Sequence, residues 1–536
     1  MSPSALENPQ HSRSTPSGGL ARSAGILGLG NIASRVIGLA REAVISGFFG
    51  ASGHLDAFRL AARVPTMVYD LLVGGMLSAA LVPVFSEYNR PDRRDELARV
   101  ASAVFSLIAL AMGITVVLIE AFAGPLAGLL GDFENPELQK VLENCLRLIA
   151  PAVFLFGLTG GVTGLLYALR RFSYTAISGA VFNLGIVILT PLLARSIDIY
   201  VLPLGIVAGS LMQLAVTAPG LRDLRIRLGK TWGHPAVRRI GRLYVPIALG
   251  LIVTQFQIIV DGRWASAAGE QSVSWMGFAT TLIQLPLGLV PVAVSLAALP
   301  SLSYFAVEQD WDGFREIFGR GLRLVLVLLV PATVGLWVLA EPVIRLLFQH
   351  GDFSLADTMM TARALRYYLI GLPFAGVDFL LNYTFYARQN TRTPATVGVV
   401  SVGFYFVTAL LLKAPLGFLG LVLADSAKQA GHAIIMSILL LRSVGRLHRQ
   451  NVLRTLWAAG GVALLMGAGV SLLVHGMGPV IPQGKVGALI TVILGGGLGG
   501  VFYLGALRLL GIEEVTRLVD VILGKMLKRN MSSNGN

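Results

Sequence analysis

The stretch Gly25–Gly50, GILGLGNIASRVIGLAREAVISGFFG, decides the fold of this chain. It has the ~20 or more mostly apolar residues that a helix needs to cross a bilayer, yet Arg35, Arg41 and Glu42 lie inside it. A charge at that depth costs roughly 2.5–3.5 kcal/mol on insertion scales, so it normally faces a protein interior or a wet cavity. On a helix Arg35 and Glu42 share one face and Arg41 points away from it. The stretch therefore predicts a transmembrane helix that shows charge to two neighbours; the alternative is that the arginines only reach the membrane interface.

The composition of the whole chain is that of a polytopic membrane protein. Of 536 residues, 54% are hydrophobic and 13% are charged, against about 25% charged residues in soluble domains. The net charge of +14 does not indicate a nucleic-acid partner, because the basic residues lie in short loops between apolar runs. The single cysteine, Cys145, excludes an internal disulfide. Residues 1–23 are polar and lack a signal-peptide pattern, so we expect a disordered tail.

Apolar windows of spanning length predict an all-α protein with about fourteen transmembrane helices. Lysine and arginine gather in the loops after even-numbered spans, so the positive-inside rule places both termini in the cytoplasm. The predicted spans are residues 24–49, 57–84, 100–123, 145–169, 173–194, 200–219, 243–266, 273–300, 321–341, 362–387, 394–413, 417–441, 454–475 and 485–509.

Two segments indicate an internal repeat. LRLIAPAVFLFGLTGGVTGLLYALRRFSYTA (Leu146–Ala176) and LRYYLIGLPFAGVDFLLNYTFYARQNTRTPA (Leu365–Ala395) lie six spans apart and share a Leu-Arg start, early Pro and Gly, and a Tyr-Ala, Arg and Thr ending. They predict two six-helix repeats in the same orientation, with a substrate site between them; the alternative is chance similarity of apolar helices. The expected parts are an N-lobe at 24–219, a basic cytoplasmic linker at 220–242, a C-lobe at 243–441, two further helices within 454–509 and a cytoplasmic tail at 510–536.

The second span carries four charges on one helical stripe, namely Asp56, Arg59, Arg63 and Asp70. Such a stripe can pair along its own helix or meet the charges of the first span across the bundle. The alternative for Asp56 and Arg59 is simple solvation near the outer end of the helix.

In the seventh span Asp261 is the best candidate for a cation ligand, since a carboxylate with neighbouring amide and carbonyl oxygens suits a hard ion. Gln255, Gln257 and Arg263 accompany it. The alternative is a local ion pair between Asp261 and Arg263.

Two other polar pairs are interpreted as structural, namely Asp378 with Asn382 in the tenth span and Asp425 with Lys428 in the twelfth. No metal-spaced histidines, nucleotide-binding loop or soluble ATPase-sized stretch occurs in the sequence. The chain is therefore predicted to be a transporter without a cofactor, driven by an ion gradient, the membrane potential or the gradient of its substrate.

Several blocks of the sequence resemble the MurJ (MviN) lipid II flippases of the MOP exporter superfamily. The blocks are SRVIGLAREAVISGFFGASGHLDAFRLAARVPTMVYDLLVGGMLSAALVPVFSEY (Ser34–Tyr88), SVSWM (Ser272–Met276), LPSLS (Leu299–Ser303), and LLFQHGDFSLADT followed by FYARQNTRTP. The resemblance implies fourteen helices in two six-helix lobes plus two helices that form a groove thought to hold the lipid tail. It also implies export of the undecaprenyl-diphosphate-linked peptidoglycan precursor across the bacterial cytoplasmic membrane by alternating access.

The resemblance also implies roles for individual residues. Arg35 and Arg41 match the two arginines of the family's first helix, Asp56 matches the acid at the start of its second, and Glu42 replaces a usual Asp. The chain departs from the family's cavity arginines, acids and Glu-Gly pair at Tyr69, Asp70, Gly74, Gly75, Thr281 and Gln284.

The family's sodium site is only partly matched. Asp261 corresponds to one of its members, while Thr408 falls about where a carboxylate or amide is expected. We predict coupling to Na⁺ or to the membrane potential, with Asp261 and Thr408 as the candidate cation site.

The site prediction is an anionic headgroup held by Arg41 with help from Arg35, Arg63 or Arg263. Gating or structural charges are expected at Glu42, Asp56 and Asp70, including a pair between Arg35 and Glu42. The predicted partners are lipid II or a similar lipid-linked precursor, membrane lipids and cell-wall synthesis proteins. The alternatives are an exporter of another lipid-linked saccharide, of O-antigen or teichoic type, and a non-transporting membrane scaffold for cell-wall synthesis.

Overall fold

The computed structural model describes residues 17–71, 80–227, 229, 233–447, 450–477, 482, 484–517 and 520, and this part of the chain folds into helices without strands. The helices before the midpoint are α1 (Ser17–Phe49), α2 (Gly53–Tyr69), α3 (Val82–Tyr88), α4 (Arg94–Ala121), α5 (Ala123–Leu130), α6 (Pro136–Ala168), α7 (Phe172–Ala176), α8 (Ser178–Ile197) and α9 (Val201–Thr217). Those after it are α10 (Pro235–Ala267), α11 (Ser272–Val307), α12 (Trp311–Val338), α13 (Ala340–Leu347), α14 (Leu355–Ala387), α15 (Arg392–Leu416), α16 (Phe418–Val444), α17 (Val452–Met477) and α18 (Lys485–Leu509).

Every predicted span overlaps one of these helices. Within the described residues nine helical stretches are long and apolar enough to cross a membrane, one of them containing both α8 and α9, so the count of fourteen stays a prediction. Two helices begin earlier than the predicted spans: α1 at Ser17, inside the expected tail, and α10 at Pro235, inside the expected linker. The second predicted span, 57–84, contains most of α2 and the start of α3; residues 72–79 of that span lie outside the described part.

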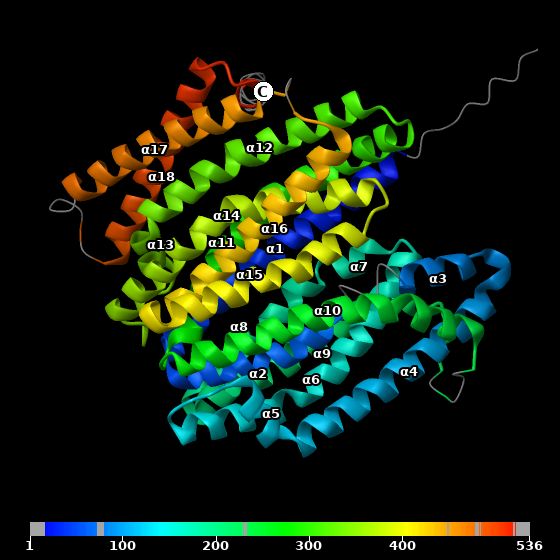
Figure 1. Ribbon diagram of the computed structural model, residues 1–536. Helices are drawn as coiled ribbons and strands as arrows, with labels where there is room; N and C mark the ends of the chain where they lie inside the picture. The colour runs from blue at the N-terminus through cyan, green and yellow to red at the C-terminus, as the bar shows by residue number, and fades with distance from the viewer. Residues whose placement is uncertain are drawn as a thin grey trace, which may run out of the picture.

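The helices form two halves with recurring neighbours (Figure 1). In the first half α6 packs against α2, α4, α5 and α9, and α8 packs against α9. In the second half α14 packs in the same way against α11, α12, α13 and α16, and α15 packs against α16. This recurrence agrees with the predicted repeat. Helices α17 and α18 pack together on α12 and α13, and α1 and α10 contact both halves.

A short helix and a three-residue loop also occur once in each half. The eight-residue helices α5 and α13 each follow a long helix after a one-residue break, at Phe122 and at Leu339. Each leads to the sequence Gly-Asp-Phe, at 131–133 and at 351–353, and then to the next long helix. We call these the first and second GDF loops.

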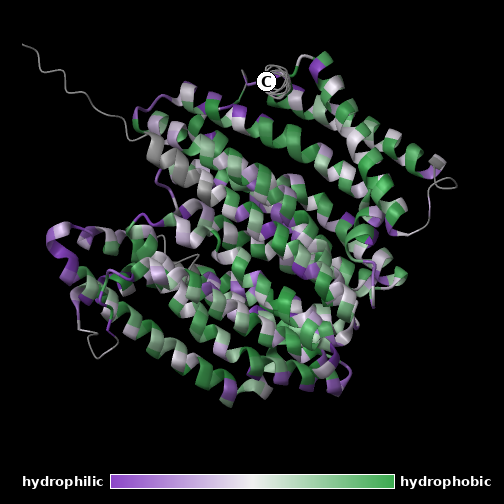
Figure 2. Cartoon of the chain, turned by 180° about the vertical axis from the view of Figure 1, so that it is seen from behind, coloured by the Kyte–Doolittle hydropathy of each residue, from purple (hydrophilic) through white to green (hydrophobic). Residues whose placement is uncertain are grey.

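Many large apolar side chains point away from the protein, as expected for a bundle whose solvent is lipid. Val36, Val117, Leu192, Leu411 and Leu472 are each at least 60% exposed. Figure 2 shows hydrophobic residues along most helices and hydrophilic residues at helix ends and between the two halves.

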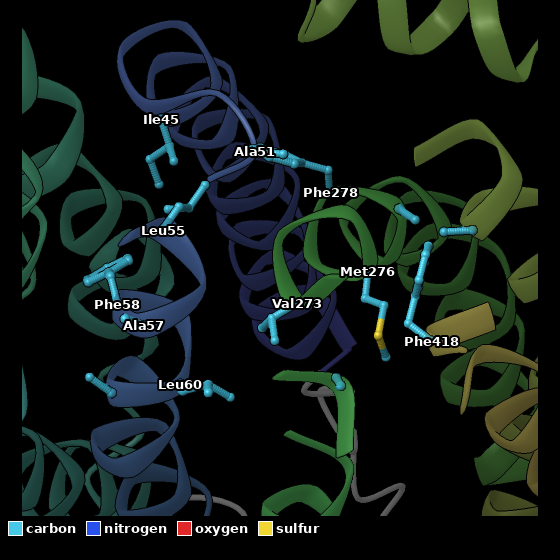
Figure 3. Packing of buried hydrophobic residues seen from close by; sticks show 14 of the residues in the cluster. Ile45, Ala51, Leu55, Ala57, Phe58, Leu60, Val273, Met276, Phe278 and Phe418 are labelled. Atoms are coloured by element: carbon cyan, nitrogen blue, oxygen red, sulfur yellow. The ribbon is translucent and has the colours of Figure 1, made fainter. Parts of the chain in front are cut away.

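A compact hydrophobic core joins the two halves where α1 ends and α2 begins (Figure 3). Ile45 of α1, Leu55 and Phe58 of α2, and Met276 and Phe278 of α11 are all at most 5% exposed and belong to one buried cluster. This end of the molecule is closed by packing, and the polar interior described below lies behind it.

Candidate functional site

The interface between the halves contains a polar cavity with two connected parts. One part has a volume of about 370 Å³ and the other about 450 Å³, and Arg41, Thr66 and Phe182 line both. Helices α1, α2, α8, α10 and α11 all contribute to its wall. A cavity therefore lies between the halves, where the substrate site is predicted.

The charged part of the cavity centres on Glu42, whose side chain is only 2% exposed. Arg41 Nη2 donates to Glu42 Oε1 at 2.7 Å, and Arg59 Nη2 donates to Glu42 Oε2 at 2.6 Å. The Arg59 guanidinium also stacks on Phe278, 4.6 Å from its ring centre. The predicted pair between Arg35 and Glu42 is wrong, because Arg59 from the neighbouring helix reaches the carboxylate instead.

Two other predicted arginines also line the cavity. Arg35 Nη1 donates to the Gln284 carbonyl of α11 at 2.5 Å, and Arg63 Nη1 donates to the Ile258 carbonyl of α10 at 2.6 Å. Both bonds run from the first half to the second. Arg35, Arg41 and Arg63 thus all line the cavity, and Arg59 joins them.

The candidate cation ligand Asp261 is engaged by protein groups. Arg63 Nη2 lies 3.4 Å from Asp261 Oδ2, and the Tyr405 hydroxyl donates to Oδ1 at 2.7 Å. The hydroxyl that reaches Asp261 from α15 is thus that of Tyr405 and not that of Thr408, one turn later. Among the described residues no three His, Cys, Asp or Glu side chains gather as a metal site.

Arg263 does not join the cavity. It hydrogen-bonds the Gly128 carbonyl and lies 3.2 Å from Asp132 in the first GDF loop. The prediction of a headgroup ligand and the alternative of a local pair with Asp261 are therefore both wrong for Arg263, because its side chain reaches the loop that faces the end of α10.

Asp56 is completely buried at the junction of α2 and α11. It accepts hydrogen bonds from the backbone N–H groups of Val273 and Ser274, at 3.3 and 2.7 Å, and from the Ser274 hydroxyl at 2.5 Å. A carboxylate is stabilised there by the unpaired N–H groups and the dipole at a helix N-terminus. Asp56 therefore ties the halves together, and the alternative of a solvated side chain is wrong.

The larger part of the cavity is lined by amides, hydroxyls and aromatic rings. Asn31, Asn183, Gln213 and Gln284 supply amides, and Phe156 and Phe182 form a tilted aromatic pair, 5.4 Å between ring centres. The substituted positions Tyr69, Thr281 and Gln284 line this part, and Asp70 lines the charged part. Gly74 and Gly75 lie outside the described residues.

The GDF loops fasten the two halves to each other in a reciprocal way. The Asp132 N–H of the first loop donates to the Ser266 hydroxyl near the end of α10, at 2.9 Å. The Asp352 N–H of the second loop donates to the Gly47 carbonyl near the end of α1, at 3.1 Å. Burial lowers the pKa of His350 beside the second loop, which favours a neutral ring at this contact. We call the two contacts the paired latches.

A further polar stripe, formed by side chains of α16 and α14, lies in the second half. Lys428 lies 3.1 Å from Asp425 and donates to Gln257 of α10 at 3.3 Å, and Asn382 Nδ2 donates to Asp378 Oδ2 at 3.0 Å. The two structural pairs predicted here are thus confirmed. His432, which the sequence analysis does not single out, hydrogen-bonds Asp378 through Nδ1. Its position inside an apolar span, four residues after Lys428, is the sequence feature that could have identified it as a buried polar group.

Comparisons with known proteins agree with this geometry. A family model described as lipid II flippase MurJ matches residues 45–490. "Probable lipid II flippase MurJ" of Bdellovibrio bacteriovorus is 28% identical over 93% of this chain and 96% of its own length. "Lipid II flippase MurJ" of Burkholderia cenocepacia is 30% identical over 70% of this chain and 74% of its own length.

Two solved structures share the fold. A lipid II flippase MurJ in an inward closed conformation superposes with a TM-score of 0.77 at 24% identity, covering 90% of this chain and 99% of that one. An inward-facing multidrug transporter of the MATE family, MOP superfamily, gives a TM-score of 0.65 at 13% identity, covering 77% and 95%.

Proposed function

Because this chain belongs to the MurJ family of lipid II flippases, we propose that it moves lipid II, the undecaprenyl-diphosphate-linked peptidoglycan precursor, from the inner to the outer leaflet by alternating access. It is a multi-pass membrane transporter and not an enzyme. The single observation that carries the proposal is the cavity between the halves, which is cationic in one part and rich in amides and aromatic rings in the other.

The cationic part suits a diphosphate. Guanidinium groups bind phosphate oxygens through paired, charge-assisted hydrogen bonds, and four arginines against three carboxylates line the whole cavity. Arg41 and Arg59 already share Glu42, so an entering phosphate competes with that carboxylate for both. Such an exchange couples substrate binding to the contact between α1 and α2.

The second part suits the saccharide. Asn31, Gln213 and Gln284 offer amide donors and acceptors, and Phe156 and Phe182 offer ring faces. The Gln213 side-chain oxygen is buried without a hydrogen-bond partner among the described residues, so a donor hydroxyl there satisfies an otherwise costly group. Because the cationic part of the cavity adjoins the part rich in amides and aromatic rings, the cavity suits a substrate in which a diphosphate is joined to a sugar.

The remaining transport properties follow from the proposal. Both termini lie in the bacterial cytoplasm, as the loop charges indicate, and cell-wall synthesis proteins receive the exported precursor. The membrane potential supplies driving force, since a charged headgroup–protein complex that moves in the field is worth about 2.3 kcal/mol per charge per 100 mV. Binding of Na⁺ at Asp261 requires that its contacts to Arg63 and Tyr405 open first.

Complementation tests the proposal in a host depleted of its own flippase. We expect the wild-type chain to restore growth and precursor export, Arg41→Ala to fail, and Arg263→Ala to succeed, because Arg263 lies outside the cavity. Rescue by Arg41→Ala as complete as by wild type contradicts the headgroup site.

Reconstitution identifies the substrate. Proteoliposomes loaded with lipid II should show headgroup transfer that depends on Arg41. Transfer of an O-antigen or teichoic precursor but not of lipid II changes the substrate, and no transfer of any lipid-linked saccharide favours a scaffold.

A further inference from the structure

Three carboxylates lie inside the helices α10, α14 and α16 of the second half, and each has one basic partner. Asp261 lies near Arg63, Asp425 near Lys428, and Asp378 near His432. Acidic groups inside a membrane protein are rare, usually paired, and often functional. The three pairs differ in one chemical respect, which is whether the base can lose its proton near neutral pH.

Arginine is effectively always protonated, and lysine has an ordinary pKa near 10.4. Histidine alone changes charge between about pH 5 and pH 8. The pair of Asp378 and His432 is therefore the one of the three whose net charge responds to physiological changes of pH.

The surroundings of His432 fit a group that takes up and releases a proton. It lies near the middle of α16 (Phe418–Val444), and its side chain is 11% exposed, against 16% for Asp378. Nδ1 faces Asp378 of α14, and Nε2 faces the Pro394 carbonyl of α15 at 3.4 Å. A protonated ring can donate to both acceptors at once, so the imidazolium joins α14, α15 and α16.

Few other charged groups face this pair. Lys428 lies one turn before His432 on α16 and is itself held by Asp425 and Gln257. On α14, Asn382 donates to Asp378, and Tyr386 lies one turn beyond Asn382 on the same helix. From α15 and α10 the described groups that face the stripe are the Pro394 carbonyl and the Gln257 amide.

We propose that the Asp378–His432 pair is a proton-binding site that couples transport to the proton gradient, an inference that rests on the proposed flippase function. In the protonated form of the site both ring nitrogens carry a proton, and Nδ1–H donates to Asp378. Release of one proton to the aqueous side leaves a neutral imidazole and an uncompensated Asp378 carboxylate inside the bundle. A buried charge that has lost its partner is strongly destabilising, so deprotonation loosens α14 from α16 until water reaches the carboxylate.

Hydrogen–deuterium exchange tests the site without any substrate. The full chain in detergent is labelled at about pH 6 and about pH 8, on either side of the ordinary histidine pKa of ~6.5, with labelling times scaled for intrinsic exchange. We expect faster exchange of α14 and α16 at the higher pH in wild type, and no pH difference in His432→Gln. The matched control, His475→Gln, changes an exposed histidine of α17 whose one hydrogen-bond partner among the described residues is the Ser471 carbonyl of its own helix, and it should behave as wild type.

The neutral variant Asp378→Asn gives a second test if His432→Gln does not fold, as judged by gel filtration. Asp378→Asn should also lose the pH difference. A pH difference that persists in either folded variant overturns the site, and so does its absence in wild type.

Transport in proteoliposomes tests the coupling. With the membrane potential clamped at zero, we expect an imposed pH gradient to change lipid II transfer by the wild type up to about tenfold per pH unit, the limit for a single-proton site. His432→Gln should keep gradient-independent transfer. A wild type that transfers lipid II without responding to the gradient overturns the coupling but leaves the proposed function standing. A wild type that transfers nothing under any gradient overturns the proposed function, while the exchange result still decides the proton site.

Discussion

Replacing Gly351 by alanine should open the latch between the second GDF loop and α1. A methyl group on Gly351 would lie 1.8 Å from the Gly47 carbonyl oxygen, far inside van der Waals contact. The methyl carbon is fixed by the backbone of residue 351 and the atoms it meets are backbone atoms of Gly47, so no side chain can rotate to relieve the overlap. The loop must move away from α1, and the hydrogen bond from Asp352 to Gly47 breaks with it.

The size of the effect follows from two terms. Gly351 has φ +57, and a non-glycine residue in this left-handed region costs roughly 1–2 kcal/mol. The lost hydrogen bond is worth about 0.5–1.5 kcal/mol net. The backbone strain acts on any conformation that keeps this φ, so the steric overlap is what favours the open latch, and the hydrogen bond that opening breaks opposes it. If the free-energy difference between the closed and open latch shifts by about 1.4 kcal/mol or more toward the open state, the ratio of closed to open molecules falls at least tenfold.

Gly417 provides a matched control. It has the same φ of +57, but nothing lies within 4 Å of a methyl group added there, so Gly417→Ala carries the backbone strain without the collision. Spin labels at His54 and Leu355, which are both exposed and lie on opposite halves, report the separation by pulsed electron resonance in a Cys145→Ala background. We expect a longer-distance population with Gly351→Ala and the wild-type distribution with Gly417→Ala. Identical distributions for the two variants would refute the reasoning.

Three further predictions concern the charged groups. Arg59→Ala leaves the buried Glu42 with one partner fewer and should destabilise the protein by about 3 kcal/mol, measured by thermal unfolding in detergent. Arg59→Lys should recover part of this loss. An Arg59→Ala variant as stable as wild type would show that the ion pair contributes nothing to stability. Glu42→Gln frees two arginines and should tighten binding of lipid II yet slow its transfer, because product release becomes harder; weaker binding contradicts the competition between Glu42 and phosphate. Arg171 donates two hydrogen bonds to Asp223 and lowers the pKa of that carboxyl. Its stabilising effect is therefore present above the ordinary value of about 3.9 and disappears as the pH falls through the lower folded value. Asp223→Asn should thus cost at most about 1 kcal/mol, at a constant level from about pH 5 to pH 8, and a loss that grows on acidification would contradict the assignment.

The sequence predicts the long helices well because lipid imposes a simple rule on them. A bilayer-spanning run of apolar residues has to be helical, and α15 to α18 follow the predicted limits within a few residues. The short helices α5 and α13 escaped prediction, since they lie at the ends of apolar runs and carry no separate periodic signal. The repeat was visible in Leu146–Ala176 and Leu365–Ala395, whereas the shorter Gly-Asp-Phe repeat gained its meaning only from the contacts that the two loops make.

The site was harder to predict because it depends on which helices touch. Arg35, Arg41 and Arg63 could be placed in a cavity from burial cost alone. The partner of Glu42 could not, because Arg59 and Arg35 both satisfy a charge argument and only the fold, which brings Arg59 within 2.6 Å of the carboxylate, selects Arg59. Arg263 failed for the same reason: the sequence places it one turn from the membrane interior but does not show that the first GDF loop lies within its reach.

The paired latches explain how one movement can open both halves at this end. Each GDF loop binds the end of the first helix of the opposite half, α10 in one case and α1 in the other. Both contacts join the same two halves, so a movement that separates the halves at this end lengthens both together. Asp56, which joins α2 to the start of α11 between them, must release its backbone donors in the same step. Its burial means that water or substrate has to replace those donors, which couples opening at this end to the state of the cavity beneath it.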